Sequence, residues 1–277
     1  MRLPSTDGVA LAVHDLGGDG PPLLLAHATG FHGRVWAPLA EALARRFRMW
    51  SFDFRGHGDS SRPTTGDVDF DWRGFGDDVL SVVDGLGLDQ PFGLGHSKGA
   101  SALLLAEQAR PATFRALYAY EPIAFPPPRP PLPDHPLVAG ALRRREVFTS
   151  LDDAERHLAA KPPLADLARE ALRAYVDHGL VPTADGSVIL KCRAADEAQM
   201  YRMGLAHPAF ERLGQVRCPV TLARGALSRA VAAELAELQV SRLPAGRLEV
   251  LDGLGHLGPL EDPPRVAEAV ARALGPS

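Results

Sequence analysis

The chain has 277 residues, and 30 Lys and Arg against 34 Asp and Glu give it a formal net charge of −4 at pH 7. Hydrophobic residues make up 45% of it and charged residues 23%, as in average soluble globular proteins, which argues against a disordered chain and against a dedicated nucleic-acid binder. The length allows one large α/β domain or two ordinary domains. We therefore expect a globular protein with a sizeable core and no nucleic-acid partner.

Cysteine usage and the lengths of the apolar runs exclude two further classes of protein. The two cysteines, Cys192 and Cys218, form no C-x-x-C pair and have no His at metal spacing, so we predict neither a disulfide framework nor a zinc site. No stretch approaches the ~18 apolar residues that a membrane helix needs, and polar residues interrupt the N-terminal segment. We expect a cytoplasmic protein without a membrane partner, and we leave its oligomeric state open, a homodimer included.

Short apolar runs alternate with longer stretches of helical period along the chain, which predicts an α/β fold with a mostly parallel sheet covered by helices. The predicted strands are residues 9–14, 22–27, 47–53, 91–96, 114–121, 219–224 and 247–251. The predicted helices between them are residues 35–46, 72–86, 99–110, 230–242 and 265–274.

One segment breaks this alternation. Eight of the sixteen residues 121–136 are Pro, which excludes both a helix interior and a central strand. Three helical patterns follow at 137–148, 152–160 and 164–178, then a β-like run at 187–191 and the helical sequence DEAQMYRMG. We therefore predict a core made of residues 1–121 and 206–277, with residues 122–205 inserted as a helical cap.

The sequence GHSKG, residues 95–99, fits the pattern G-x-S-x-G directly after an apolar run and directly before a helical pattern. A sharp turn between strand and helix exposes a serine hydroxyl, and small residues on both sides let the strand and the helix approach each other. The same turn aims the backbone N–H of Lys98 and the positive end of the helix at a developing oxyanion. We predict that Ser97 is a nucleophile.

A serine hydroxyl is a weak nucleophile near pH 7 and needs a base, usually His. Among the ten histidines, His256 follows a strand-like run, stands in a glycine-rich turn and precedes the last helix. In open α/β sheets ligands are bound at the carboxyl ends of the strands, which is where this loop belongs. We predict that His256 is the base.

Four segments in this order resemble the α/β-hydrolase family: HATGF at 27–31, DFRGHGDS at 53–60, GHSKG at 95–99 and GLGHLGPLEDP at 253–263. The resemblance implies the α/β-hydrolase sheet, with the cap between its sixth and seventh strands. It also implies that the backbone N–H of Thr29 is the second oxyanion donor. The polar residues of the first two segments, His27, Asp53, Arg55 and His57, are expected to brace loops rather than to do chemistry.

The acid departs from the commonest pattern of this family, in which an Asp follows the seventh strand. Here that stretch reads TLARGALSRA and holds no carboxylate. Glu121 closes the strand-like run before the proline-rich segment and resembles the acid of a subgroup that carries it after the sixth strand, so we predict a Ser97, His256 and Glu121 triad. The rival carboxylates are Asp252, Glu261, Asp262 and Asp196.

The side chain of Lys98 is unusual because a cation in the first turn of a helix opposes the helix dipole. We expect it to form an ion pair with an acidic group on the cap or at the rim of the pocket. The alternative is that it holds an anionic group of the substrate.

A serine nucleophile disfavours epoxide hydrolysis and dehalogenation, because the alkyl-enzyme would be an inert ether. We expect hydrolysis of carboxylic esters or lactones through an acyl-enzyme, without a metal or other cofactor. A C–C bond hydrolase and a ligand-binding, receptor-like protein with little turnover stay open as alternatives. Phe31, Phe125, Met200 and Met203 are predicted to line a pocket for a small apolar ester or lactone, unless they only join the cap to the core.

Overall fold

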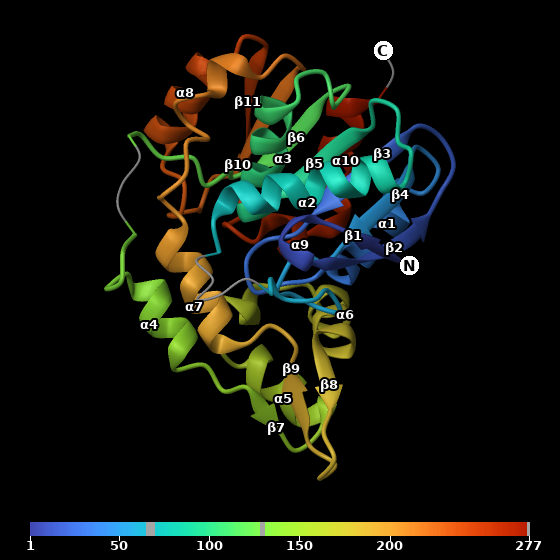
Figure 1. Ribbon diagram of the computed structural model, residues 1–277, viewed down its shortest axis with the longest axis vertical. Coiled ribbons are helices and arrows are strands. Elements are labelled where there is room, and N and C mark those ends of the chain that lie inside the picture. Colours follow the sequence, from blue (N-terminus) through green and yellow to red (C-terminus); the bar gives the residue numbers. More distant parts are fainter. Residues whose placement is uncertain (65–69, 128–130, 276–277) are drawn as a thin grey trace.

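The computed structural model describes residues 1–64, 70–127 and 131–275. Its main sheet has eight strands in the order β1-β2-β4-β3-β5-β6-β10-β11 (Figure 1). These strands are β1 (Arg2–Pro4), β2 (Ala10–Gly17), β3 (Pro22–Ala26), β4 (Arg48–Phe52), β5 (Phe92–His96), β6 (Leu117–Tyr120), β10 (Val220–Gly225) and β11 (Gly246–Leu251). From β4 to β11 along this order all neighbours are parallel, whereas β2 pairs antiparallel with β1 and β4. The predicted mostly parallel sheet is confirmed.

Helices cover both faces of this sheet because successive strand residues point to opposite sides. In β3, Leu23 and Leu25 join an apolar cluster with α1 and α10, whereas Leu24 and Ala26 join a second cluster with α2 and α3. The core helices are α1 (Ala37–Leu43), α2 (Trp72–Gly85), α3 (Lys98–Ala109), α8 (Ala233–Arg242), α9 (Gly258–Glu261) and α10 (Pro263–Leu274). Short 3₁₀ turns lie at Thr6–Gly8, Gly33–Trp36, Leu164–Asp166 and Leu213–Gln215.

The chain between β6 and β10 forms a group of elements on one side of the main sheet (Figure 1). They are α4 (Pro136–Leu142), β7 (Val147–Phe148), α5 (Leu151–Ala159), α6 (Arg169–Gly179), β8 (Leu180–Pro182), β9 (Val188–Leu190) and α7 (Ala194–Met203). The three strands make a small antiparallel sheet in the order β7-β9-β8. We call residues 122–205 the cap.

Two helices predicted in the cap differ from those in the structure. The helix predicted at 137–148 stops at Leu142, because Val147 and Phe148 pair with β9 and the Phe148 side chain is buried. The helix predicted at 164–178 is divided into a 3₁₀ turn and α6. In both places tertiary pairing and packing override a helical period that is local to the sequence.

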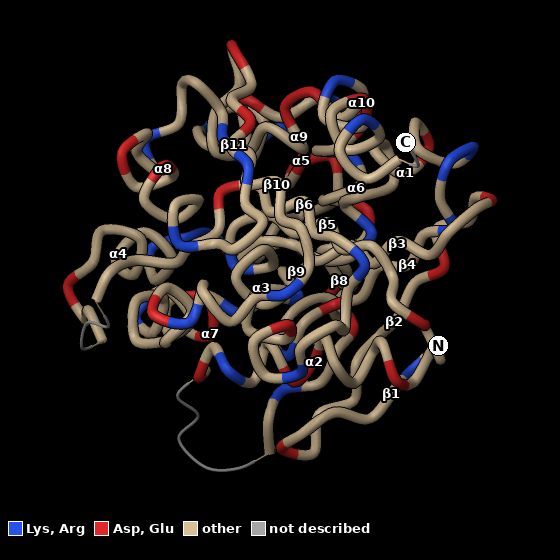
Figure 2. The backbone as a smooth tube through the Cα atoms, turned by 90° about the horizontal axis from the view of Figure 1, so that it is seen from above, with Lys and Arg blue, Asp and Glu red and all other residues tan. Residues whose placement is uncertain are grey.

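Among the described residues, no helix is both long and apolar enough to cross a membrane. Acidic and basic residues are distributed over the core and the cap (Figure 2). Cys192 and Cys218 are both buried free thiols.

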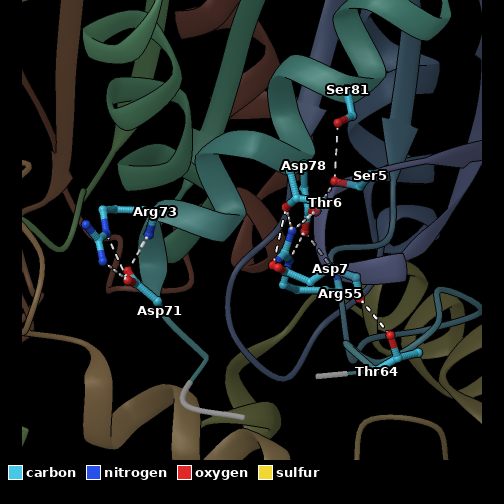
Figure 3. Close-up of polar contacts among 9 residues, drawn as sticks. All are labelled: Ser5, Thr6, Asp7, Arg55, Thr64, Asp71, Arg73, Asp78 and Ser81. Atoms are coloured by element: carbon cyan, nitrogen blue, oxygen red, sulfur yellow. Dashed lines mark hydrogen bonds and ion pairs between the residues drawn. The ribbon is translucent and has the colours of Figure 1, made fainter. Parts of the chain in front are cut away.

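The loop after β4 is braced by a buried ion pair. The Arg55 guanidinium donates through Nε and Nη2 to the Asp78 carboxylate on α2, at 2.9 and 2.7 Å, and through Nη1 to Asp7 at 2.8 Å (Figure 3). Asp53 accepts the backbone N–H groups of Gly33 and Asp59 at 2.7 and 2.8 Å. Such charge-assisted hydrogen bonds offset the cost of desolvating the charges, and they tie the loop to α2, to the N-terminal segment and to Gly33.

Candidate active site

Ser97 stands at the turn between β5 and α3 with φ 56° and ψ −118°, a backbone conformation that residues other than glycine rarely adopt. The flanking glycines are required by space. A Cβ at Gly95 would lie 2.5 Å from the Ala100 Cα, and a Cβ at Gly99 would lie 2.1 Å from the Ala26 carbonyl oxygen. The predicted sharp turn is therefore present at Ser97, which is 8% exposed.

Three side chains from distant parts of the chain form one hydrogen-bonded series. His256 Nε2 lies 3.1 Å from Ser97 Oγ, and His256 Nδ1 lies 2.6 Å from Glu121 Oε2. Because Nδ1 faces a carboxylate, it carries the ring proton, and Nε2 is left to accept the serine proton. The His256 loop, between β11 and α9, is fixed by His96 Nε2 at 2.7 Å from the His256 carbonyl oxygen and by the Tyr120 hydroxyl, which donates to Gly255 at 2.7 Å.

Glu121 directly follows β6, which pairs with β5, the strand that precedes Ser97, and the Glu121 side chain is fully buried. Its Oε1 accepts the Gly225 backbone N–H at 2.9 Å, and its Oε2 accepts the Ser228 hydroxyl at 2.6 Å. Ser228 stands in the loop after β10, and no local sequence pattern predicts its contact with Glu121. Its hydroxyl hydrogen-bonds the Glu121 carboxylate and does not take that carboxylate's place beside the imidazole.

None of the four rival carboxylates contacts the imidazole of His256 in the described structure. Glu261 accepts the backbone N–H groups of the His256 loop at residues 255 and 257, and Asp262 caps α10. Asp196 pairs with Arg62, and Asp252 is exposed. Among these five carboxylates, only Glu121 contacts His256.

The two predicted oxyanion donors are unused. Neither the Thr29 nor the Lys98 backbone N–H donates to another described residue. The next peptide of the same loop is anchored, because the Gly30 N–H donates to His57 Nε2 at 3.2 Å. An oxyanion hole requires backbone N–H groups that have no other partner, as these two have none among the described residues.

A cavity of about 440 Å³ lies between this loop and the cap. It is lined by Thr29, Gly30 and Phe31, by residues of α4 and of the segments after it, and by Tyr175, Glu197 and Tyr201. Its wall includes Thr29, the predicted oxyanion donor, but neither Ser97 nor His256.

Of the four predicted pocket residues, only Phe31 lines this cavity. Met200 is fully buried in the apolar cluster that holds α2, Met203 packs against the same cluster, and Phe125 is not part of the cavity wall. The structure therefore supports the alternative given above for the two methionines, that they join the cap to the core and do not line the pocket.

A larger cavity, about 640 Å³, lies along α2 and α3 and includes none of Ser97, His256 or Glu121 in its wall. Much of its charge is already neutralised, since Arg55 pairs with Asp7 and Asp78, and Arg73 pairs with Asp71 (Figure 3). The smaller cavity also lacks the three triad residues, but its wall holds Thr29 and Phe31, two of the predicted site residues, so we take it as the candidate binding cavity.

The family model described as "Alpha/beta hydrolase family" matches residues 23–269. The chain belongs to the α/β-hydrolase family. A 2-(acetamidomethylene)succinate hydrolase of Mesorhizobium japonicum is 29% identical over 240 residues, which are 86% of this chain and 82% of the relative.

Solved structures agree with this α/β-hydrolase fold. A crystal structure of E-2-(acetamidomethylene)succinate hydrolase superposes with a TM-score of 0.82 at 24% identity, covering 99% of this chain and 98% of that one. A structure of N-formylmaleamic acid deformylase from Pseudomonas putida S16 has a TM-score of 0.78 at 20% identity, covering 98% and 99%. At these identities the likeness shows the fold alone.

The ion pair expected for Lys98 is not present in the described part of this α/β-hydrolase. The fully buried ammonium nitrogen lies 4.2 and 4.4 Å from the ring centres of Phe54 and Phe75, and 3.3 Å from His57 Nε2. Burial holds the pKa of Lys98 well below its usual value. His57 Nδ1 faces the Arg55 carbonyl oxygen at 3.0 Å, so Nε2 accepts the Gly30 N–H, while the Lys98 nitrogen lies against the same ring, 3.3 Å from Nε2 and 3.5 Å from Nδ1.

Replacing Lys98 by Met is expected to lower kcat about tenfold with little change in KM. The variant keeps the backbone N–H but removes the amine from His57, so the loop with Gly30 and Thr29 loses part of its anchoring. The loss is smaller than the ~10²- to 10³-fold cost of deleting an oxyanion donor outright. Steady-state kinetics with one ester measure it, and an unchanged kcat would count against this role.

The same variant is expected to be more stable at pH 7, because it no longer has to bury an amine that burial keeps from its ordinary protonation and that has no carboxylate partner among the described residues. Between the lowered pKa of Lys98 and its ordinary 10.5, the unfolded wild type binds more protons than the folded protein, so the wild-type free energy of unfolding rises with pH in that window. The advantage of the variant should therefore shrink as the pH approaches 10.5. Urea unfolding at two pH values measures it.

Proposed function

We propose that this α/β-hydrolase is a serine hydrolase that cleaves carboxylic esters or lactones through an acyl-enzyme, with Ser97, His256 and Glu121 as its triad. The observation that carries the proposal is the continuous series from Ser97 Oγ through the imidazole to a fully buried carboxylate, with distances of 3.1 and 2.6 Å.

In the first half of the reaction, His256 Nε2 takes the Ser97 proton while Oγ forms a bond to the acyl carbon. The N–H groups of Thr29 and Lys98 stabilise the resulting oxyanion, and Glu121 stabilises the imidazolium. The imidazolium then protonates the leaving oxygen as the bond between it and the acyl carbon breaks. In the second half, water gives a proton to His256 Nε2 as its oxygen bonds to the acyl carbon. The imidazolium then returns that proton to Ser97 Oγ as the bond between Oγ and the acyl carbon breaks and the acid leaves.

A second candidate function is hydrolysis of an N-acyl bond by the same steps, with a nitrogen leaving group. It is supported by the relative that is named for an acetamido compound. The sequence left two alternatives, which predict other results in the following experiment. C–C bond hydrolysis predicts little turnover of a simple ester, and ligand binding without turnover predicts none.

A fluorophosphonate probe is expected to label the Ser97 peptide, as mass spectrometry of a digest would show, and p-nitrophenyl butyrate should be turned over. Ser101→Ala is the matched control, because Ser101 is a buried serine of the same helix whose hydroxyl donates to the Ile123 carbonyl at 3.0 Å. It should be labelled like the wild type. A protein that resists the probe and turns over neither esters, lactones nor N-acyl compounds would contradict the proposal.

A further inference from the structure

The charges that line the cap cavity are unbalanced. Its wall contains the cations Arg143, Arg144, Arg145 and Lys161, but Glu197 is the only carboxylate among the described lining residues. The chain as a whole has a net charge of −4, so this excess of positive charge is local. A cavity lined by one sign of charge attracts ligands of the other sign.

Two of these cations are already neutralised. The Arg144 Nη1 lies 2.6 Å from Glu197 Oε2, and its Nη2 donates to the Cys192 carbonyl oxygen at 2.7 Å. The Arg145 guanidinium pairs with Asp153 at 2.6 Å and lies over the Phe148 ring. Both side chains are fixed by these contacts, so they shape the cavity without leaving charge free.

The other two cations have no carboxylate partner within the described parts of the chain. Arg143 is exposed at the end of α4, and the exposed Lys161 has its ammonium nitrogen 3.4 Å from His157 Nε2. The His157 imidazole cannot supply a negative charge to Lys161. Slight burial, together with the cations Lys161 and Arg145, lowers the pKa of His157. Arg143 and Lys161, which we call the cationic pair, are therefore available to a ligand.

The expectation of an apolar substrate named Phe31, Phe125, Met200 and Met203, and of these four only Phe31 lines this cavity. The same wall that holds the cationic pair also holds Thr29, the predicted oxyanion donor. Its volume of about 440 Å³ suits a small molecule.

We propose that the cavity selects small acyl substrates that carry a carboxylate, which binds the cationic pair while the acyl carbon lies at Thr29. This inference rests on the proposed function for the identity of the reacting bond, but not for the binding of the carboxylate. It makes Arg143 and Lys161 specificity-determining residues.

Two esters of equal chain length test the selection. Mono-p-nitrophenyl glutarate ends in a carboxylate, and p-nitrophenyl valerate ends in a methyl group. The wild type should prefer the glutarate ester about tenfold in kcat/KM, as expected for a charge-assisted contact, and the preference should fall as NaCl is raised. The double variant Arg143→Gln with Lys161→Gln should lose the preference and keep its activity on the valerate ester.

The matched control is Arg173→Gln, which removes a cap cation outside the cavity wall that pairs with Glu155 and Asp177 at 2.8 and 3.0 Å. It should keep the wild-type preference. Equal kcat/KM for the two esters in the wild type, or a preference that survives in the double variant, would overturn the inference.

Calorimetric titration with free glutarate separates this inference from the proposed function. Binding to the wild type that weakens about tenfold in the double variant supports the cationic pair even if neither ester is turned over, in which case only the proposed function fails. Turnover of the valerate ester without any glutarate binding overturns the inference and leaves the proposed function standing.

Discussion

Replacing Ser97 by Ala is expected to lower kcat for p-nitrophenyl butyrate by about 10⁴- to 10⁶-fold, because the hydroxyl is the only proposed atom that bonds to the acyl carbon. Alanine fits the same turn, whose strain comes from the backbone at φ 56° and not from the hydroxyl. The series from His256 to Glu121 and the free N–H groups of Thr29 and Lys98 stay in place. Any residual rate should come from oxyanion stabilisation and binding alone.

Steady-state kinetics, together with a thermal melt that shows an unchanged fold, measure this loss. Ser101→Ala controls for removal of a hydroxyl from α3, since the Ser101 Oγ also lies 3.3 Å from the Ser97 carbonyl oxygen. A Ser97→Ala variant that keeps a tenth or more of the wild-type kcat would show that another group is the nucleophile.

The parts of the fold that the sequence predicts are those whose signals are local. The apolar runs of β3 and β5 are buried on both faces, as parallel strands are, and their side chains fill the two clusters under the helices. The cap strands β7 and β8 have two and three residues, pair with β9, and each bury one side chain, Phe148 and Leu180, in the first apolar cluster. Segments this short carry little signal of their own, so the helical period at 137–148 predicts a helix where the structure has β7.

The residues of the candidate site also divide into those with a local sequence signal and those without one. Ser97 and His256 are marked by glycines that the turns require, and these are visible in the sequence. The support of Glu121 by Ser228 depends on β6 lying beside β10, which no local pattern shows. Likewise, methionines at helical spacing predict an apolar face but not what it packs against, so the sequence cannot distinguish a pocket residue from the core residue that Met200 is.

Glu121→Gln is expected to lower kcat by about 10⁴-fold with the fold intact. The Gly225 backbone N–H holds an acceptor at the Oε1 position, so the amide oxygen of a glutamine belongs there and its NH₂ group takes the Oε2 position. That group lies toward His256 Nδ1 and donates to it. The imidazole is then forced to carry its proton on Nε2, where it cannot accept the proton of Ser97.

Kinetics with a good ester substrate measure this effect, and Asp252→Asn is the control because Asp252 is exposed on the same loop segment as His256. If Asp252→Asn lowers kcat by orders of magnitude and Glu121→Gln does not, the acid is misassigned.

A further change distinguishes a lost charge from a damaged loop: adding Ser228→Asp to Glu121→Gln should restore part of the rate. The Ser228 Oγ lies 2.6 Å from Glu121 Oε2, so a carboxylate at residue 228 approaches the same imidazole from the side of β10.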